Sequence, residues 1–361
     1  MKRFIIPVLM LITTSLRAFD ATIPVLHLPD YLNEDKKEAF LEKLESAMHE
    51  VGFFALTGTG VDPDILDNGY EAIKEFFALD LDYKMSMRSA SGQRGYVLSE
   101  SAKGENVMDL KEFCHIGHEL SDADLKRLGY VKNIWPQHPQ GYKESMLAMY
   151  NGLEKCRATL CNAFSEVLKQ PLEFLDEMTV EGDSLMRTIH YPANGPKSSI
   201  WAGAHTDINL FTILPRSTAK GLQVLNKEGQ WIDVLTPDGA FVINCGDFLE
   251  NLTNGYARSS FHRVIDPGLG QERFSTVFFV HTRSSDRLDP LPQWIEKTGG
   301  KRLRANATRL ELLAERLIDL RLASQELKQF FVDSGAIERL KEVNRFSLKA
   351  EAELRKSGFD I

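Results

Sequence analysis

Short apolar segments dominate the second half of the chain, and this pattern constrains the fold more than any other feature of the sequence. The segments are SLMRTIHY, FTILP, GLQVL, WIDVL, AFVINC and RFSTVFFVH, separated by clusters of Gly, Pro, Asn and Asp. Strands that recur every 8–12 residues or so are typical of a sandwich or a barrel. LQVLNKEGQWIDVL has the pattern of a hairpin with its turn around residues 227–229. We therefore predict a double-stranded β-helix, or jelly roll, over residues 182–290.

Helical patterns flank this strand-rich core on both sides. The region 22–181 combines short strands at 23–28 and 52–56 with apolar residues at helical spacing over 33–51, 63–79 and about 141–168. The region 291–361 is rich in Arg, Leu, Glu, Lys and Ala, which predicts terminal helices from about 308 to 356. The expected fold class is α+β, with an N-terminal helical region, the jelly-roll core and C-terminal helices forming one unit.

The charge balance restricts the class of partner. The 43 Lys and Arg residues against 51 Asp and Glu residues leave a net charge of −8, and the pI is about 5.7. A broad attraction to nucleic acid or to anionic lipid is therefore not expected, and a small-molecule substrate fits better. No segment after the first 20 residues approaches the ~20 apolar residues of a membrane helix.

The N-terminus and the cysteines bear on localisation. Residues 1–20 place Lys2 and Arg3 before an apolar run, as in a secretory signal, but Pro7 interrupts the run and Arg17 lies where a cleavage region is usually neutral. The four cysteines lack C-x-x-C spacing and are too sparse for a disulfide framework. We expect a cytoplasmic protein, and export through the signal-like N-terminus is the alternative.

The segment GAHTDINLFTILP points to a metal site. If residues 204–214 form one strand, His205 and Asp207 point to the same face. A buried carboxylate beside an imidazole requires compensation, which a divalent cation provides, and His262 in FHRVI supplies a second imidazole. Two His and one carboxylate form the facial triad of mononuclear non-haem Fe(II) oxygenases, which leaves half of the coordination sphere to substrate and O2.

A second pair of polar residues follows the predicted triad. Arg273 and Ser275 lie on one face of the strand ERFSTVFFVH, eleven positions after His262. A guanidinium offers two parallel hydrogen bonds to a carboxylate, and a serine hydroxyl adds a third. The pair could therefore hold the far end of a dicarboxylate whose near end reaches the metal.

Several motifs, in order, resemble one family. HYP, GAHTD, GLQV, GDFLENLTNG, SSFHRVI and RFS are similar to segments of the isopenicillin N synthase-like 2-oxoglutarate and Fe(II)-dependent dioxygenases. RGY, LKEFCHIGHE and NIWP resemble the N-terminal region of the same family, so that the resemblance covers roughly residues 22–320. The combined set is far more specific than any single motif.

The resemblance implies roles for individual residues. It implies that His205, Asp207 and His262 bind Fe(II), that Arg273 and Ser275 hold the distal carboxylate of 2-oxoglutarate, and that Tyr191 also contacts this co-substrate. Ile189 departs from the pattern, because plant members often have Asn there. The implied reaction consumes O2 and 2-oxoglutarate, releases succinate and CO2, and hydroxylates, desaturates or cyclises a small molecule.

Further candidates and alternatives remain at this point. Arg94 and Tyr96 are candidates for substrate contact, because a cation and a phenol could hold a carboxylated substrate. FCHIGH lacks a fourth spaced ligand, so we do not expect its Cys and His residues to bind a metal. Isopenicillin-forming and ascorbate-using members also contain R-x-S. One alternative is therefore an oxidase that does not use 2-oxoglutarate and takes its electrons from the substrate or from ascorbate. A non-catalytic metal-binding jelly roll is the other.

Overall fold

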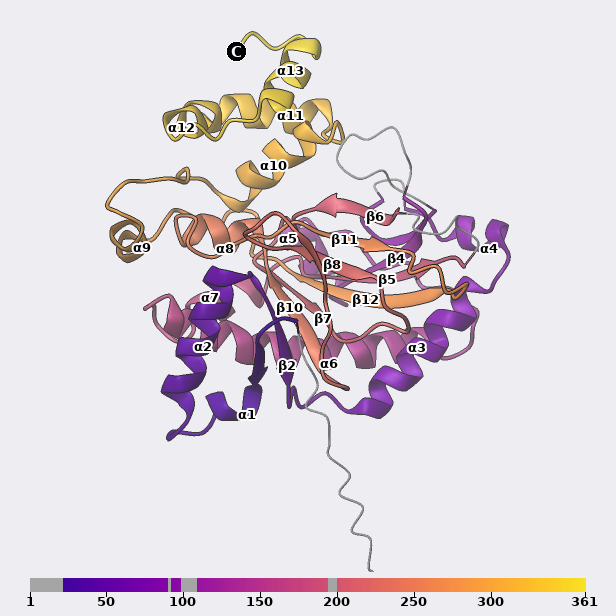
Figure 1. Cartoon of the computed structure of the whole chain (residues 1–361). Coiled ribbons are helices and arrows are strands. Elements are labelled where there is room, and N and C mark those ends of the chain that lie inside the picture. Colours follow the sequence, from indigo (N-terminus) through magenta and orange to yellow (C-terminus); the bar gives the residue numbers. More distant parts are fainter. Residues whose placement is uncertain (1–21, 90–91, 99–108, 194–199) are drawn as a thin grey trace, which may run out of the picture.

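A computed structural model of the chain describes residues 22–89, 92–98, 109–193 and 200–361 (Figure 1). The signal-like segment 1–20 lies outside the described residues.

Two β-sheets form the centre of the molecule. The larger has eight strands in the order β1-β2-β10-β7-β12-β5-β4-β3, and the smaller has four in the order β6-β11-β8-β9. Only β1 and β2 pair in parallel, and all other pairs are antiparallel. The strands are β1 (Val25–His27), β2 (Phe53–Thr57), β3 (Gly95–Val97), β4 (Glu112–Gly117), β5 (Leu185–Tyr191), β6 (Ile200–His205), β7 (Phe211–Leu214), β8 (Leu222–Leu225), β9 (Trp231–Asp233), β10 (Phe241–Cys245), β11 (His262–Ile265) and β12 (Arg273–Val280).

The two sheets pack face to face. One buried apolar cluster joins Phe53 and Val242 of the large sheet to Val224 of the small sheet. A second cluster joins Phe113 of the large sheet to Trp201 of the small one. This antiparallel two-sheet core confirms the predicted jelly roll, and the hairpin of β8 and β9 lies where the sequence places it.

Helices cover the outer face of the large sheet and extend the C-terminus. Figure 1 shows α3 and α6 along the lower side of the sheets and α2 beside β1 and β2. The apolar sides of these helices and the large sheet form the largest buried cluster. The helices are α1 (Leu28–Tyr31), α2 (Lys37–Glu50), α3 (Pro63–Phe77), α4 (Leu81–Ser86), α5 (Asp122–Leu128), α6 (Tyr142–Val167), α7 (Phe174–Thr179), α8 (Asp247–Leu252), α9 (Pro292–Lys297), α10 (Arg309–Asp319), α11 (Gln325–Asp333), α12 (Ala336–Glu342) and α13 (Leu348–Lys356). None of the described helices has both the length and the apolarity needed to cross a membrane.

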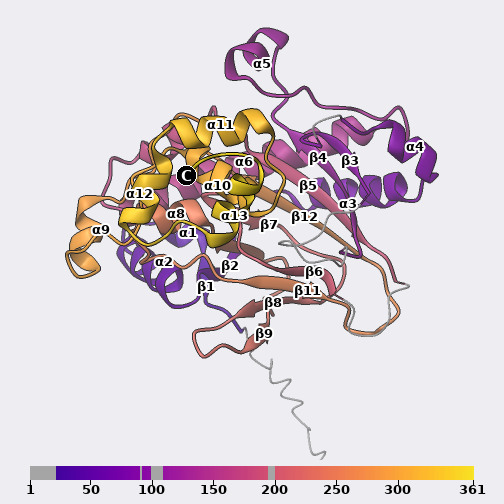
Figure 2. The same cartoon turned by 90° about the horizontal axis from the view of Figure 1, so that it is seen from above.

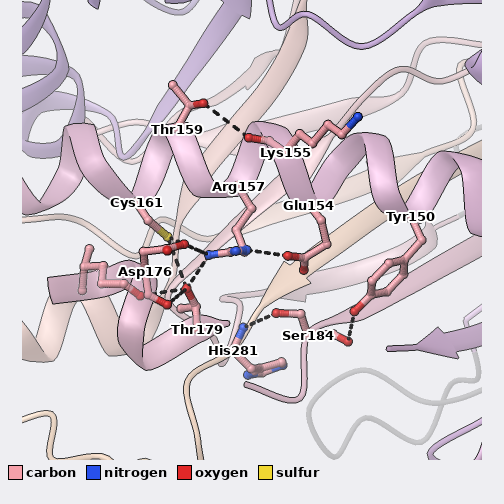
Figure 3. A network of polar contacts seen from close by, with 11 residues as sticks. Tyr150, Glu154, Lys155, Arg157, Thr159, Cys161, Asp176, Thr179, Ser184 and His281 are labelled. Atoms are coloured by element: carbon pink, nitrogen blue, oxygen red, sulfur yellow. Dashed lines mark hydrogen bonds and ion pairs between the residues drawn. The ribbon is translucent and has the colours of Figure 1, made fainter. Parts of the chain in front are cut away.

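Buried polar contacts fasten α7 to the long helix α6. The guanidinium of Arg157 donates to Glu154 one turn earlier, and across to Asp176 and Thr179 of α7, each at 2.7 Å (Figure 3). Burial opposes the charge of Arg157, but the neighbouring carboxylates raise its pKa. Because α7 leads directly into β5, these contacts fix the entry of the chain into the jelly roll.

The C-terminal helices α10 to α13 form a compact unit with a core of its own. Figure 2, seen from above, shows this unit gathered over α8. Its buried residues, including Ile318, Phe331, Leu340 and Leu354, are separate from the main core. The capping box of Thr308 and Glu311 begins α10 at the predicted position.

One predicted strand is wrong. The sequence predicts a single strand over residues 204–214, but β6 ends at His205 and β7 begins at Phe211, in the other sheet. Three backbone amides at the start of α8 donate to carbonyl groups of residues 207–210 at 2.8–3.0 Å and hold this connection as a tight turn. Gly246 is required there, because a Cβ would lie 2.2 Å from the carbonyl oxygen of Asn209. The ligand residues therefore meet through a turn between sheets and not through strand alternation.

Candidate metal centre

The three predicted ligands converge at one end of the small sheet. His205 is the last residue of β6 and His262 the first of β11, and the two are paired directly across the antiparallel ladder. Their ring centroids are 4.3 Å apart. Asp207 lies two residues beyond β6, in the turn that crosses to the large sheet.

The donor atoms of these residues face a common point. Asp207 Oδ1 lies 3.7 Å from His205 Nε2 and 3.6 Å from His262 Nε2, and one ligand atom of each residue lies within 4.8 Å of the others. In the part of the chain that the structure describes, no other group of three His, Cys, Asp or Glu residues meets this criterion. The residues Cys114, His115 and His118 of FCHIGH accordingly form no such group.

Hydrogen bonds fix the orientation of both imidazoles. His205 Nδ1 contacts the carbonyl oxygen of Gly203 at 2.7 Å, and His262 Nδ1 contacts that of Ser260 at 3.2 Å. A carbonyl oxygen can only accept, so each Nδ1 carries a proton, and in the neutral ring each Nε2 then presents its lone pair. This is the tautomer that a metal ligand needs, and such contacts typically orient ligating histidines.

Two buried polar side chains that the sequence analysis missed hold Asp207. Thr212 Oγ1 donates to Asp207 Oδ2 at 2.5 Å, and Asn244 Nδ2 donates to the same oxygen at 2.8 Å. Both donors bond Oδ2, which leaves Oδ1 directed toward the imidazoles. The sequence feature that could have identified them is a threonine and an asparagine within the apolar strands β7 and β10, where buried polar residues usually have a hydrogen-bond partner.

Electrostatics favour a metal-binding protonation state. Burial, followed by the neighbouring His262, lowers the pKa of His205 and keeps its imidazole neutral. Burial alone would raise the pKa of Asp207, but its surroundings, which include the hydrogen bonds from Asn244 and Thr212, lower it, so the carboxyl is ionised. Two imidazole nitrogens and one carboxylate oxygen that lie close together in the wall of one cavity fit a divalent cation such as Fe(II).

A cavity between the two sheets joins this centre to the predicted co-substrate residues. Its wall includes the three ligands together with Arg273, Ser275 and Tyr191. Arg273 pairs with Tyr191, and Ser275 with Ile189, across the ladder of β12 and β5. The structure therefore brings all six residues to one cavity, and the apolar Ile189 also lines it.

Arg273 is a buried cation within this wall. It is 1% exposed, donates to Ser275 Oγ at 3.0 Å and to the carbonyl oxygen of Ala219 at 3.1 Å, and lies 5.0 Å from the ring centroid of Tyr191. No described carboxylate forms an ion pair with it. Burial lowers its pKa, so a bound anion would stabilise the charge.

The structure places Arg94 and Tyr96 away from this wall. Arg94 is buried and donates to Asp183 Oδ1 at 2.5 Å, and the hydroxyl of Tyr96 donates to Glu112 Oε2 at 2.5 Å. Neither residue lines the cavity that holds the triad. Both have structural partners, so a contact with substrate stays a prediction for them. Two cations that the sequence analysis did not select, Lys111 and Arg187, do line the cavity.

Comparison with known families agrees with this geometry. Residues 182–282 match the model of the 2OG-Fe(II) oxygenase superfamily. Residues 23–138 match the model described as non-haem dioxygenase in morphine synthesis N-terminal. The two matches span the jelly roll and most of the N-terminal region.

Individual proteins are similar over most of their length. A homoarginine-6-hydroxylase of Arabidopsis thaliana is 32% identical over 286 residues, 76% of this chain and 86% of that protein. A crystal structure of a protein from Caulobacter crescentus, described as of the 2OG-Fe(II) oxygenase family, has a TM-score of 0.75 at 33% identity, covering 82% and 98% of the two chains. A Neurospora crassa protein, solved in complex with alpha-KG and thymine, shares the fold, with a TM-score of 0.72 at 23% identity over 82% of this chain and 96% of that one.

Loss of the hydroxyl that supports Asp207 should weaken metal binding. We expect Thr212→Val to raise the dissociation constant for Fe(II) by about 10- to 100-fold, because a carboxylate with fewer hydrogen bonds is a less well oriented ligand. Anaerobic equilibrium titration measures the change. Thr159→Val, on α6 and remote from the cavity, is the control, and an unchanged constant in Thr212→Val would contradict this role.

Proposed function

Because this chain belongs to the 2OG-Fe(II) oxygenase superfamily and is a 2-oxoglutarate- and Fe(II)-dependent oxidoreductase, we propose which of its residues bind the metal, the co-substrate and the substrate. The triad described above binds Fe(II). Arg273, Ser275 and Tyr191 bind 2-oxoglutarate, and the rest of the cavity receives a small molecule whose C–H bond is hydroxylated.

The protein positions the reacting groups and excludes water from them. Bound Fe(II) and 2-oxoglutarate supply the chemistry, in which O2 is consumed, 2-oxoglutarate leaves as succinate and CO2, and one oxygen atom enters the substrate. The triad residues line the cavity, so a metal held by them would be open to small molecules that enter the same cavity. Phe53, Leu214, Val242 and Val264 line the same space and keep it apolar.

The position of Arg273 is the observation that supports this assignment most strongly. A guanidinium that is 1% exposed, without a described carboxylate partner, is costly unless a ligand completes it. Ser275 Oγ, 3.0 Å away, offers a further hydrogen bond to the same carboxylate. A dicarboxylate held there by one end can reach the triad with the other, because all these residues share one cavity.

Removal of the Arg273 cation should specifically weaken the binding of 2-oxoglutarate. In an anaerobic titration of the Fe(II)-loaded protein, 2-oxoglutarate should produce a visible charge-transfer band. Arg273→Ala should require at least about 30-fold more 2-oxoglutarate for half of the band, because loss of a buried charge-assisted contact costs about 2–5 kcal/mol. Arg263→Ala, whose Nε donates to Gln223, is the matched control. An equal 2-oxoglutarate requirement in both variants would contradict the assignment.

We propose further that the substrate has an anionic group. Arg187, Ile189 and Tyr191 alternate along β5 toward the cavity, so Arg187 stands four residues, about 13 Å, from the co-substrate end. Its guanidinium carbon lies 4.2 Å and 5.4 Å from the ring centroids of Phe113 and Phe279, and its Nε donates to His115 Nε2 at 2.7 Å. Packing of this kind limits the motion of the guanidinium and suits it to recognise a planar acid group.

The names of the relatives give a starting set of compounds. The homoarginine-6-hydroxylase suggests an amino acid, whose carboxylate Arg187 would bind. The proposal predicts that an accepted acid accelerates succinate formation and that the corresponding amine without the carboxylate does not. In Arg187→Gln, the KM for that acid should rise at least tenfold while the 2-oxoglutarate titration stays unchanged. Equal use of the acid and its amine would contradict an anionic substrate.

We propose a cytoplasmic location for the enzyme. All four cysteines are buried free thiols, an arrangement that is common in a reducing compartment. The expected result is that the chain isolated from its own cells keeps residues 1–20, as read by intact-mass spectrometry. A mature chain that begins near residue 19 would instead support export.

A further inference from the structure

The C-terminal helical unit contacts the metal centre through one side chain. Arg316 extends from α10, and its Nη2 donates to Thr206 Oγ1 at 2.8 Å. Thr206 is the residue between the ligands His205 and Asp207. The matched oxygenase segment ends at residue 282, so this contact comes from a part of the chain outside it.

The contact belongs to a brace around the ligand turn. Thr206 Oγ1 donates to Asp247 Oδ2 at 3.4 Å, and Arg316 Nη2 lies 3.9 Å from the same carboxylate oxygen. The backbone amide of Asp247 donates to the carbonyl oxygen of Asp207 at 2.8 Å. Arg316 and Asp247 thus hold the turn at two successive residues.

Arg316 is itself held in place by the helical unit. Its side chain is 19% exposed, and its Nη1 lies 3.9 Å from Asp319 one turn later on α10. Ser347, the N-cap of α13, donates its hydroxyl to Asp319 and its backbone amide to Glu315 at 3.0 Å. The position of the guanidinium is therefore fixed by the packing of the helices, unlike that of a free surface side chain.

We propose that Arg316 is a positioning residue for the metal centre. By fixing Thr206, it sets the direction of the turn that separates the two ligands, and so couples the packing of α10 to α13 to Fe(II) affinity. The inference rests on the proposed metal ligands and adds a residue that does not line the cavity of the metal centre. Contacts beyond the ligands commonly change metal affinity by about 10- to 100-fold, so this effect is measurable.

The test is Fe(II) affinity in the full-length protein. Arg316→Gln should raise the dissociation constant for Fe(II), measured by anaerobic titration, about tenfold. Arg316→Lys, which keeps the charge and one donor, should recover part of the loss. Arg302→Gln, at an exposed position before α10, is the matched control and should bind Fe(II) like the wild type.

Urea unfolding of the metal-free variants separates positioning from simple stabilisation. The proposal predicts weaker Fe(II) binding in Arg316→Gln at urea concentrations where the variant is fully folded. Thr206→Val removes the hydroxyl and leaves Arg316 beside Asp247, and it should weaken Fe(II) binding to a similar extent. This variant replaces Arg316→Gln in the test if Arg316→Gln does not fold. Fe(II) constants within twofold of wild type in the folded variants would overturn the inference. Failure of the wild type to bind Fe(II) would instead overturn the proposed function.

Discussion

The structure depends on how one buried carboxylate is held. Asp207 is 6% exposed, and its two oxygens have different surroundings. Thr212 and Asn244 donate to Oδ2, whereas Oδ1 faces two imidazole nitrogens at 3.6 and 3.7 Å. A charge in such a place needs compensation that hydrogen bonds to a single oxygen do not complete, and a divalent cation provides it. Metal binding is therefore the chemical consequence of the arrangement.

The jelly roll meets this requirement by joining its two sheets at the ligand turn. His205 and His262 are adjacent on the small sheet, while Thr212 and Asn244, which hold the carboxylate, belong to the large one. The same cavity wall continues along β5 and β12 to Arg273, so the triad and the residues proposed to bind the co-substrate line one cavity. Packing between the sheets thus sets the spacing of ligands that lie far apart in the sequence.

Sequence patterns predicted the fold class, the long helices and the triad, because each rests on local periodicity or on a specific motif. They failed where tertiary contacts decide. The apolar pattern of residues 204–214 resembles one strand, yet contacts from the start of α8 turn the chain there into the other sheet. The partners of Asn244 and Arg316 are 37 and 110 residues away in the chain, so the folded arrangement is needed to assign their roles. Thr212 is only five residues from Asp207, but the turn that brings its hydroxyl to the carboxylate is not visible in the sequence pattern. Arg94 is a candidate for substrate contact in the sequence but is buried against Asp183 in the structure.

The most direct test of the account is to locate the metal. Crystals grown anaerobically with Fe(II) should give, in diffraction data collected at the iron absorption edge, a single anomalous peak per chain between His205, Asp207 and His262. That peak would confirm that the three residues form one centre. A peak at any other position, or none in iron-loaded crystals that diffract well, would contradict the central claim.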